Sequence, residues 1–246
     1  MNTNEKTSMN SPKRLARIAG VLYLLVAIFA AFAFDFVYTR LYVAGDAAAT
    51  AGNVLANPGL VRMGVIADML QVTVWVFLAL TLRRLLKHVH HGAADAMVVL
   101  VAIGAGIVCL NTVFEFEGMR IATDSSYASA LGAGGSNALV LLLLDTQHFG
   151  LYIAQLFYGL WLVPLGYLAC KSSGMFPRWL GILLIVGAAG WLVDLLAAFL
   201  APGIGVKIHT FVGVIPPVIA EVSLLIYLLA IGVKTARPGK LSLDAA

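Results

Sequence analysis

The sequence predicts an all-α membrane protein, a polytopic bundle of six transmembrane helices. Of its 246 residues, 61% are hydrophobic and only 11% are charged, whereas a soluble domain carries roughly 25% charged residues. The mean hydropathy is +0.95. The apolar residues fall in six runs, each of the roughly 20 residues that a helix needs to cross a bilayer. This composition excludes a soluble enzyme and a disordered chain.

The six predicted spans cover residues 15–37, 61–86, 94–116, 137–169, 177–200 and 209–233. The fourth is longer than a bilayer is thick, so we expect it to tilt or to break near Pro164, whose ring removes a backbone donor. Pro216 and Pro217 predict a kink in the sixth. The runs are continuous and rich in Leu, Ala and Val, which argues against a membrane barrel of short alternating strands.

The chain is expected to form a single domain over residues 13–235, with a disordered tail at 1–12 and a second tail at 236–246. Two loops on the side opposite the termini, 38–60 and 117–136, are long enough to have structure. In the first, Asp46 is expected to cap a short helix that Asn57 and Pro58 end. The second is rich in Gly and Ser and is expected to be mobile.

Basic residues predict the orientation. Of the 16 Lys and Arg, only Arg40, Arg62, Arg120 and Lys207 fall on the side opposite the termini. The positive-inside rule therefore predicts that both termini are cytoplasmic, in a multi-pass protein of the bacterial inner membrane. The pI near 9.1 reflects a basic rim that faces anionic lipid headgroups, so the expected surroundings are the lipid bilayer and no nucleic acid.

Four motifs carry a resemblance to a known family. They are Gly45-Asp46 through Thr50-Ala51-Gly52-Asn53; Leu60-Val61-Arg62-Met63-Gly64 with Asp68; Phe157-Tyr158-Gly159-Leu160-Trp161 with Gly166-Tyr167-Leu168; and Phe176-Pro177-Arg178-Trp179-Leu180-Gly181. In their order and spacing, from about residue 14 to 233, the chain resembles the bacterial membrane family called domain of unknown function 4386. The resemblance implies a helical protein of six or seven spans and supplies no activity.

Polar residues inside the spans are the candidate binding residues, because an ionisable side chain at the bilayer centre costs about 2.5–3.5 kcal/mol. Helical spacing puts them on coherent faces. If these faces share the bundle axis, they line one polar cavity open to the exterior, and we expect the ligand-binding residues to be Asp68, Gln71, Asn111, Asp145, His148, Tyr152, Gln155, Asp194 and Glu221. Arg62 and Arg120 are expected at the rim. Asp35, Glu115 and Glu117 are expected to be solvated helix ends.

Catalysis and metal binding have less support in the sequence. His148 and Glu221 are the candidate catalytic residues, with Asp145 orienting His148. Asp145, His148 and Glu221 are the set that a divalent cation such as zinc would use. A catalytic zinc commonly has two or three His ligands, and only His148 is well inside a span, so no cofactor is predicted. The Asp145–His148 pair has an alternative reading as a hydrogen-bonded structural pair.

Three functions are compatible with these residues. The first is binding of a small cation, a proton or an amphiphilic ligand in an outward-facing polar cavity, in transport or sensing, with the two outer loops as lids. The second is an intramembrane hydrolase, with or without a metal ion, acting on a lipid. The third is a structural membrane subunit that binds partner helices through the small-residue face around Gly187, Gly190 and Asp194. The ligand, the oligomeric state and partner proteins do not follow from the sequence.

Overall fold

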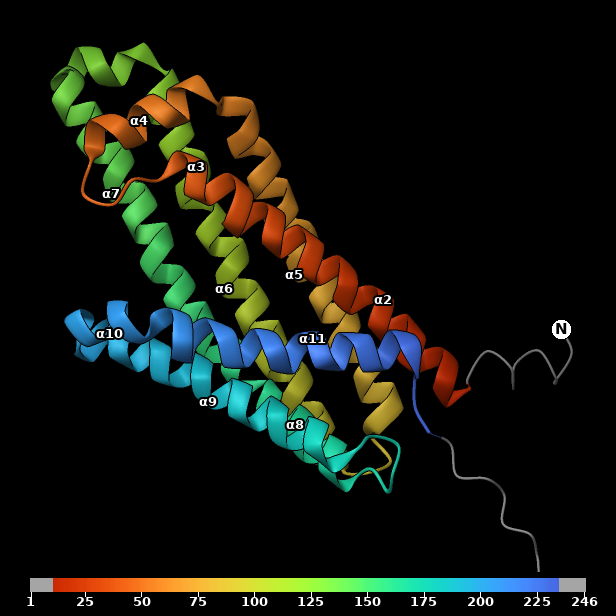
Figure 1. Cartoon of the computed structure of the whole chain (residues 1–246). Helices are drawn as coiled ribbons and strands as arrows, with labels where there is room; N and C mark the ends of the chain where they lie inside the picture. The colour runs from red at the N-terminus through yellow and green to blue at the C-terminus, as the bar shows by residue number, and fades with distance from the viewer. Residues whose placement is uncertain (1–10, 235–246) are drawn as a thin grey trace, which may run out of the picture.

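The computed structural model describes residues 11–234, and every regular element in that range is helical. Six helices are long and apolar enough to span a membrane, which confirms the predicted fold class (Figure 1). The predicted tails, 1–12 and 236–246, lie outside the described residues except for Ser11 and Pro12.

Of the first three spans, the first and second are joined by residues 42–57, and the second and third by the short turn at 87–90. The first consists of α2 (Pro12–Ala30), the π-helix η1 (Ala31–Tyr38) and α3 (Thr39–Leu41). It begins where the Ser11 hydroxyl accepts a hydrogen bond from the Arg14 N–H, as helix N-caps do. The second span is α5 (Pro58–Leu86) and the third is α6 (His91–Thr123). Pro58 opens α5 because a helix needs no N–H at its first position.

The last three spans contain the predicted proline breaks. The fourth span is α7 (Ser125–Leu160) followed by α8 (Leu162–Lys171), with a turn at Trp161, so the predicted break before Pro164 is confirmed. The fifth is α9 (Arg178–Leu200). The sixth consists of α10 (Pro202–Ile208), the π-helix η2 (His209–Val214) and α11 (Ile215–Ala230). It therefore starts earlier than predicted and becomes an α-helix again at Pro216 and Pro217.

Of the two connections on the α4 side, the sequence predicted one correctly and the other incorrectly. The short helix is confirmed as α4 (Ala47–Ala56), and Asp46 caps it by accepting from the Ala49 N–H over 2.9 Å. The Gly- and Ser-rich segment 117–136 was predicted to be a mobile loop, and the structure corrects this. The segment is almost entirely helical, because α6 continues to Thr123 and α7 begins at Ser125. A kink at Gly132, with φ 73°, turns this part of α7, and glycine adopts that backbone conformation without strain.

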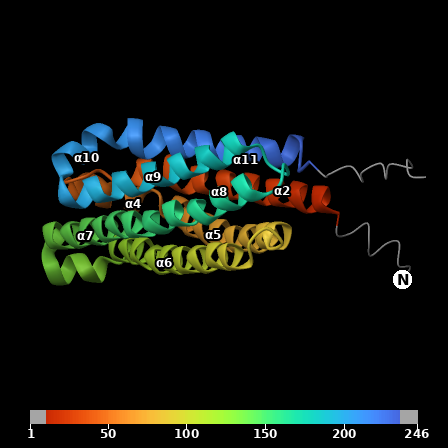
Figure 2. The same ribbon diagram turned by 90° about the horizontal axis from the view of Figure 1, so that it is seen from below.

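The spans pack as a closed ring in chain order. Neighbouring pairs are α2–α5, α5–α6, α6–α7, α7–α9 and α9–α11, and α11 returns to α2. Both ends of the described chain lie at one end of the bundle, here called the terminal end, and α4 lies at the other, the α4 end (Figures 1 and 2). At the terminal end α2 and α11 are in tight contact, because a Cβ on Gly20 would lie 2.9 Å from Leu229. Away from it the two helices diverge (Figure 1).

Two apolar cores enclose a polar layer. The larger core fills the terminal half and includes Trp75, Leu82, Met97, Leu165, Leu184 and Leu228. The smaller one lies near the α4 end and includes Val37, Val54, Val61, Met119 and Leu144. Between them along α5, α6 and α7 lie buried polar side chains, including Asp68, Asn111, Glu115 and Gln147. Buried polar groups must find partners, so this layer is where function is to be sought.

Candidate functional site

A cavity of about 600 Å³ lies in the wedge between the diverging first and last spans. Its back wall comes from α5, α7 and α9. Eight Phe, Tyr and Trp side chains line the cavity: Tyr23, Phe34, Tyr38, Trp75, Tyr152, Tyr158, Trp161 and Trp191. The volume lies within the roughly 300–1,000 Å³ of small-molecule sites, and an apolar wall with few polar groups is typical of them.

The cavity opens sideways, between α2/η1 and α11. Ala27 and Ala31 form one lip and Val218 and Val222 the other, and these four residues both line the cavity and are exposed. The valines follow helical spacing, i and i+4, so they share one face of α11. Both lips lie inside helices that could cross the membrane. The opening therefore lies along the length of these two spans and not at an end of the bundle.

Glu221 joins three helices at the wall of the cavity. Its Oε2 accepts a hydrogen bond from the Tyr23 hydroxyl over 2.7 Å. Its Oε1 accepts one from the indole N–H of Trp191 over 3.1 Å. The two bonds tie α11 to α2 and α9. Glu221 is a single carboxylate among aromatic rings, which is the arrangement that recognises a cationic group.

His148 and Asp145 do not form the hydrogen-bonded pair that one reading of the sequence predicted. His148 Nδ1 instead lies 2.9 Å from the hydroxyl of Tyr38, and Tyr42 donates to Asp145 Oδ1 over 2.6 Å. Partial burial and the hydrogen bond to Asp145 raise the pKa of Tyr42 to about 12. The rings of Tyr38, Tyr42 and His148 are stacked, with centroids 5.0–5.8 Å apart. The end of the first span therefore orients His148.

Asp194 forms a third group with Gln155 and His209. Gln155 donates to Asp194 Oδ2 over 2.8 Å, and His209 Nδ1 lies 3.0 Å from each carboxylate oxygen. The backbone of η2 packs directly against this carboxylate, because a Cβ on Gly213 would overlap it. Asp194 is almost completely buried. It therefore acts on the cavity through Gln155 and His209, both of which line it.

A fourth group lies outside the cavity, between α5, α6 and α7. Gln147 donates through Nε2 to Glu115 Oε2 over 2.9 Å, and Asn111 donates to the backbone carbonyl of Gln147 over 2.8 Å. Asp68 lies near Glu115 and makes no hydrogen bond within the described chain. Glu115 is only 5% exposed, which corrects its prediction as a solvated helix end.

The structure thus distributes the predicted binding residues. Five of them line the cavity: Gln71, His148, Tyr152, Gln155 and Glu221. The other four, Asp68, Asn111, Asp145 and Asp194, do not. The structure therefore corrects the expectation that four carboxylates share one cavity. Of the four, only Glu221 lines it, and each carboxylate has its own surroundings. Of the two rim residues, Arg62 is exposed, and Arg120 is paired with Glu117 at 2.9 Å; neither lines the cavity.

The residues proposed for a metal are not grouped in the part of the chain that the structure describes. Within residues 11–234, no three His, Cys, Asp or Glu side chains lie where they could hold one metal ion together. Asp145 and Glu221 accept hydrogen bonds from different aromatic residues. Asp145, His148 and Glu221 therefore belong to separate hydrogen-bonded groups.

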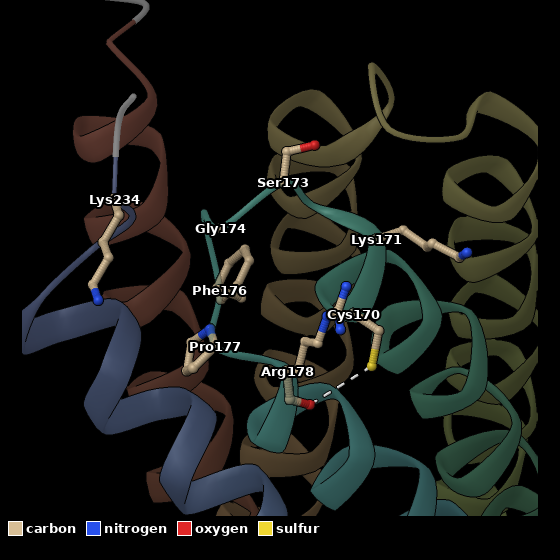
Figure 3. A pocket seen from close by; sticks show the side chains of 8 residues that line it. All are labelled: Cys170, Lys171, Ser173, Gly174, Phe176, Pro177, Arg178 and Lys234. Atoms are coloured by element: carbon tan, nitrogen blue, oxygen red, sulfur yellow. Dashed lines mark hydrogen bonds between the residues drawn. The ribbon is translucent and has the colours of Figure 1, made fainter. Parts of the chain in front are cut away.

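A second hollow, of about 610 Å³, lies at the terminal end around the turn between α8 and α9. Figure 3 shows its lining, which includes Lys171, Arg178 and Lys234 around Gly174 and Pro177. Its three basic side chains make no ion pair within the described residues. They are exposed. Such a surface suits the headgroup region of a membrane, and it contains no buried polar group that would define a specific site.

Several cavity residues were not among the predicted set. Tyr23, Tyr38, Trp75, Trp161 and Trp191 line the cavity, but aromatic residues in a span are ordinary packing residues by sequence. His209 lines it too, although its predicted position was the edge of a span. The pattern that could have located them is the cavity face of the first span, where Tyr23 and Val26 are followed by Ala27, Ala30, Ala31 and Phe34 at helical spacing.

Comparisons with known proteins show a family and no activity. The family model described as "Domain of unknown function (DUF4386)" matches residues 18–232. A curated protein of Archaeoglobus fulgidus, described as "Uncharacterized protein", is 34% identical over 61 residues, which is 25% of this chain and 37% of that protein. The chain thus spans little more than a third of that relative. No solved structure matches the chain.

Proposed function

The chain belongs to the family of Domain of unknown function (DUF4386), and from the geometry of its cavity we propose that it binds a cationic amphiphile. The ligand enters sideways from the membrane between α2 and α11. Its cationic head binds beside Glu221, and its apolar chain extends through the opening into the lipid. Binding of this kind serves transport or sensing of a membrane-soluble compound. The sideways opening of the cavity at membrane depth is the observation that carries the proposal.

The charge of the lining supports a cationic head. Glu221 and Asp35 supply carboxylates, and the lining contains no Lys or Arg among the residues that the structure describes. Trp75, Trp161 and Trp191 present rings that attract a cation by about 0.5–2 kcal/mol each when their faces are accessible. Anionic amphiphiles meet no compensating charge there. The cavity therefore favours a positive or zwitterionic head over a negative one.

The shape of the opening supports an apolar tail. The lips are formed by small or branched apolar residues, Ala27, Ala31, Val218 and Val222, and the exposed Asp35 follows Ala31 one turn further along the first span. An alkyl chain lying between them exchanges contact with lipid for contact with protein at little cost. A water-soluble ligand would have to cross the lipid to reach this opening. The site therefore selects ligands that partition into the bilayer.

Lipid hydrolysis, the alternative function, receives less support from these contacts. It needs His148 as a base held by Asp145, but Asp145 accepts its hydrogen bond from Tyr42. A purely structural role needs a polar face that is filled by protein, and the cavity leaves about 600 Å³ beside Glu221. Ligand binding uses this space directly.

The proposed topology follows from charge. At the terminal end lie Lys13, Arg14, Arg17, Arg83, Arg84, Lys87, Lys171, Arg178 and Lys234, against Arg40, Arg62, Arg120 and Lys207 at the other end. By the positive-inside rule the terminal end faces the cytoplasm and the protein lies in a bacterial inner membrane. Fusing a reporter that is active only outside the cytoplasm after Lys234, and separately within the 42–46 connection, tests this. We expect activity from the second fusion alone.

Tryptophan fluorescence can test ligand binding, because three of the four Trp residues line the cavity. The probe is a brominated alkyltrimethylammonium, whose bromine quenches nearby indoles. With the purified protein in nanodiscs, we expect saturable quenching, and at least tenfold weaker apparent affinity in Glu221→Gln, which corresponds to about 1.4 kcal/mol. The matched control, Glu117→Gln, removes a half-buried carboxylate that pairs with Arg120 outside the cavity, and it should bind as the parent protein does.

Two outcomes would contradict the proposal. One is linear quenching that does not saturate, since it would show only partition of the probe into the lipid. The other is equal affinity for the brominated alkyl sulfate of the same chain length, since the cavity would then not distinguish the sign of the head. A loss of binding reports on the site only if Glu221→Gln is still folded at the temperature of the assay, which its thermal unfolding transition must show.

A further inference from the structure

We infer that the buried group formed by Asp68, Gln71, Glu115 and Gln147 is a site for a small hard monovalent cation, of which Na⁺ is the representative. The group is separate from the amphiphile site, because of these four residues only Gln71 lines the cavity. It lies between α5, α6 and α7. All four side chains are at least 95% buried.

Hydrogen-bond acceptors in this group outnumber donors. The buried oxygens Asp68 Oδ1, Gln71 Oε1 and Gln147 Oε1 have no hydrogen-bond partner. The buried hydroxyl of Tyr158 also has none, but it offers a single donor. Within residues 11–234, neither Asp68 Oδ2 nor Glu115 Oε1 receives a hydrogen bond. The one hydrogen bond between side chains of the group is the donation from Gln147 to Glu115. Leaving a buried polar atom without a partner costs about 1–3 kcal/mol. Several such oxygens together therefore call for a positively charged species among them.

The positions of the four residues bring these oxygens together. Gly64 and Asp68 are one turn apart on α5, and a Cβ on Gly64 would lie 3.1 Å from Glu115 Oε1. The carboxylates of Asp68 and Glu115 are near enough to repel each other. Gln147 donates to Glu115 through its amide nitrogen Nε2. The unpartnered oxygen Oε1 of the same amide therefore also lies close to Glu115. Gln71 follows Asp68 on α5 at helical spacing.

The charge balance identifies the class of ligand. No Lys, Arg or His lies within 4 Å of either carboxylate in the described chain. Of the other titratable groups, the phenol of Tyr38 interacts electrostatically with Glu115 and that of Tyr158 with Asp68. Two unpaired carboxylates in a low-dielectric interior cannot both remain charged. Without a cation, two protons neutralise the pair. A bound monovalent cation takes the place of one of them, so binding of the cation releases one proton.

The donor set favours Na⁺ over other metals. Carboxylate and amide oxygens are hard ligands, which excludes a preference for the softer metals that use His or Cys. Calcium needs six to eight oxygen ligands, and the described group supplies two carboxylates and two amides. Sodium accepts fewer oxygens and a lower ligand charge.

Binding of ²²Na⁺ to the purified full chain in detergent tests the inference. At pH 8 in choline chloride, we expect saturable binding with one ion per chain, undiminished by equimolar K⁺ or Ca²⁺. In a weakly buffered solution, addition of Na⁺ should release protons. Asp68→Asn and Glu115→Gln should each weaken binding at least tenfold, whereas Glu117→Gln, on the same helix, should not.

Labelling of the unmodified protein keeps the inference falsifiable if these variants fold poorly. A hydrophobic carbodiimide forms a stable N-acylurea with a protonated buried carboxyl, and mass spectrometry identifies the modified residue. We expect labelling of Asp68 or Glu115 that Na⁺ suppresses and choline does not. Labelling that is independent of Na⁺ would show a site that takes protons alone, and would overturn the inference. So would ²²Na⁺ binding that persists unchanged in Asp68→Asn, or a response to Ca²⁺ without one to Na⁺.

Discussion

Tyr23 and Glu221 form a 2.7 Å hydrogen bond between the first and the last span, although 198 positions separate them in the chain. The bond lies at the cavity wall, beyond the point where α2 and α11 touch at Gly20 and Leu229. It therefore closes the ring of helices a second time, with a polar contact at the inner edge of the opening. The same carboxylate that we assign to the ligand head also holds the fold together.

Tyr23→Phe should lower the thermal stability of the protein. The change leaves Glu221 Oε2 buried without its donor, which costs about 1–3 kcal/mol of unfolding free energy. Thermal unfolding in detergent measures the effect. The matched control, Tyr167→Phe, removes a hydroxyl from a side chain that is 40% exposed and should change little. Because the lost bond is shared, Tyr23→Phe combined with Glu221→Gln should cost less than the sum of the two single changes; strictly additive losses would contradict the contact.

Val218→Phe should obstruct the opening of the cavity. Val218 lines the cavity at its exposed lip, and a larger ring there narrows the way in from the lipid. We expect quenching by the brominated ammonium probe to develop several-fold more slowly, with thermal unfolding unchanged. Ile226→Phe is the matched control, since Ile226 is 58% exposed on the same helix and does not line the cavity. Equal rates in both variants would show that the ligand enters elsewhere.

Gly213→Ala should destabilise the group around Asp194. The added Cβ overlaps the Asp194 carboxyl, so η2 must move, and overpacking of this kind costs about 1–3 kcal/mol. Gly106→Ala is the comparison, because nothing lies within 4 Å of a Cβ there, and Gly to Ala in a helix interior stabilises by up to about 1 kcal/mol. Opposite shifts in the melting temperature are expected. A neutral Gly213→Ala would show that η2 is free to move away from Asp194.

The cap of α7 should give a pH-dependent stability. Asp124 accepts a hydrogen bond from the Ser126 N–H over 2.9 Å, and its side-chain and backbone hydrogen bonds with Ser126 hold the pKa of Asp124 below its usual value. A lowered folded-state pKa means that the stabilisation is complete above about pH 4, the value expected in the unfolded chain, and disappears as the pH falls through the lower folded-state value. The parent protein should therefore lose more stability between pH 6 and pH 3 than Asp124→Asn, whose neutral cap does not titrate. Parallel melting curves for the two proteins would contradict this.

The sequence predicted the spans well because hydrophobic length is a local property. The cap at Asp46 and the break before Pro164 are local too, and the structure contains both. The depth of Glu115 was missed because the third span was expected to end at residue 116. Since α6 continues to Thr123, Glu115 lies two turns inside the helix.

The arrangement of the polar groups could not be predicted because it depends on how each helix is rotated about its axis. Helical spacing correctly puts His148, Tyr152 and Gln155 on the cavity side of α7. It does not show that Tyr42, just beyond the first span, reaches Asp145, or that His209, in the π-helix η2 of the sixth span, reaches Asp194. Each carboxylate thereby acquires different neighbours. One cavity and one buried oxygen cluster result, where the sequence suggested a common site.

The ends of the described chain are adjacent, since a Cβ on Gly232 would lie 3.4 Å from the carbonyl oxygen of Lys13. A peptide linker between the two termini could therefore make a cyclic protein without pulling any helix out of place. Such a closure would clamp α2 to α11 at their narrow end and leave the wide end free. A cyclised protein that still binds its ligand would show that the opening between α2 and α11 needs to widen only toward the α4 end.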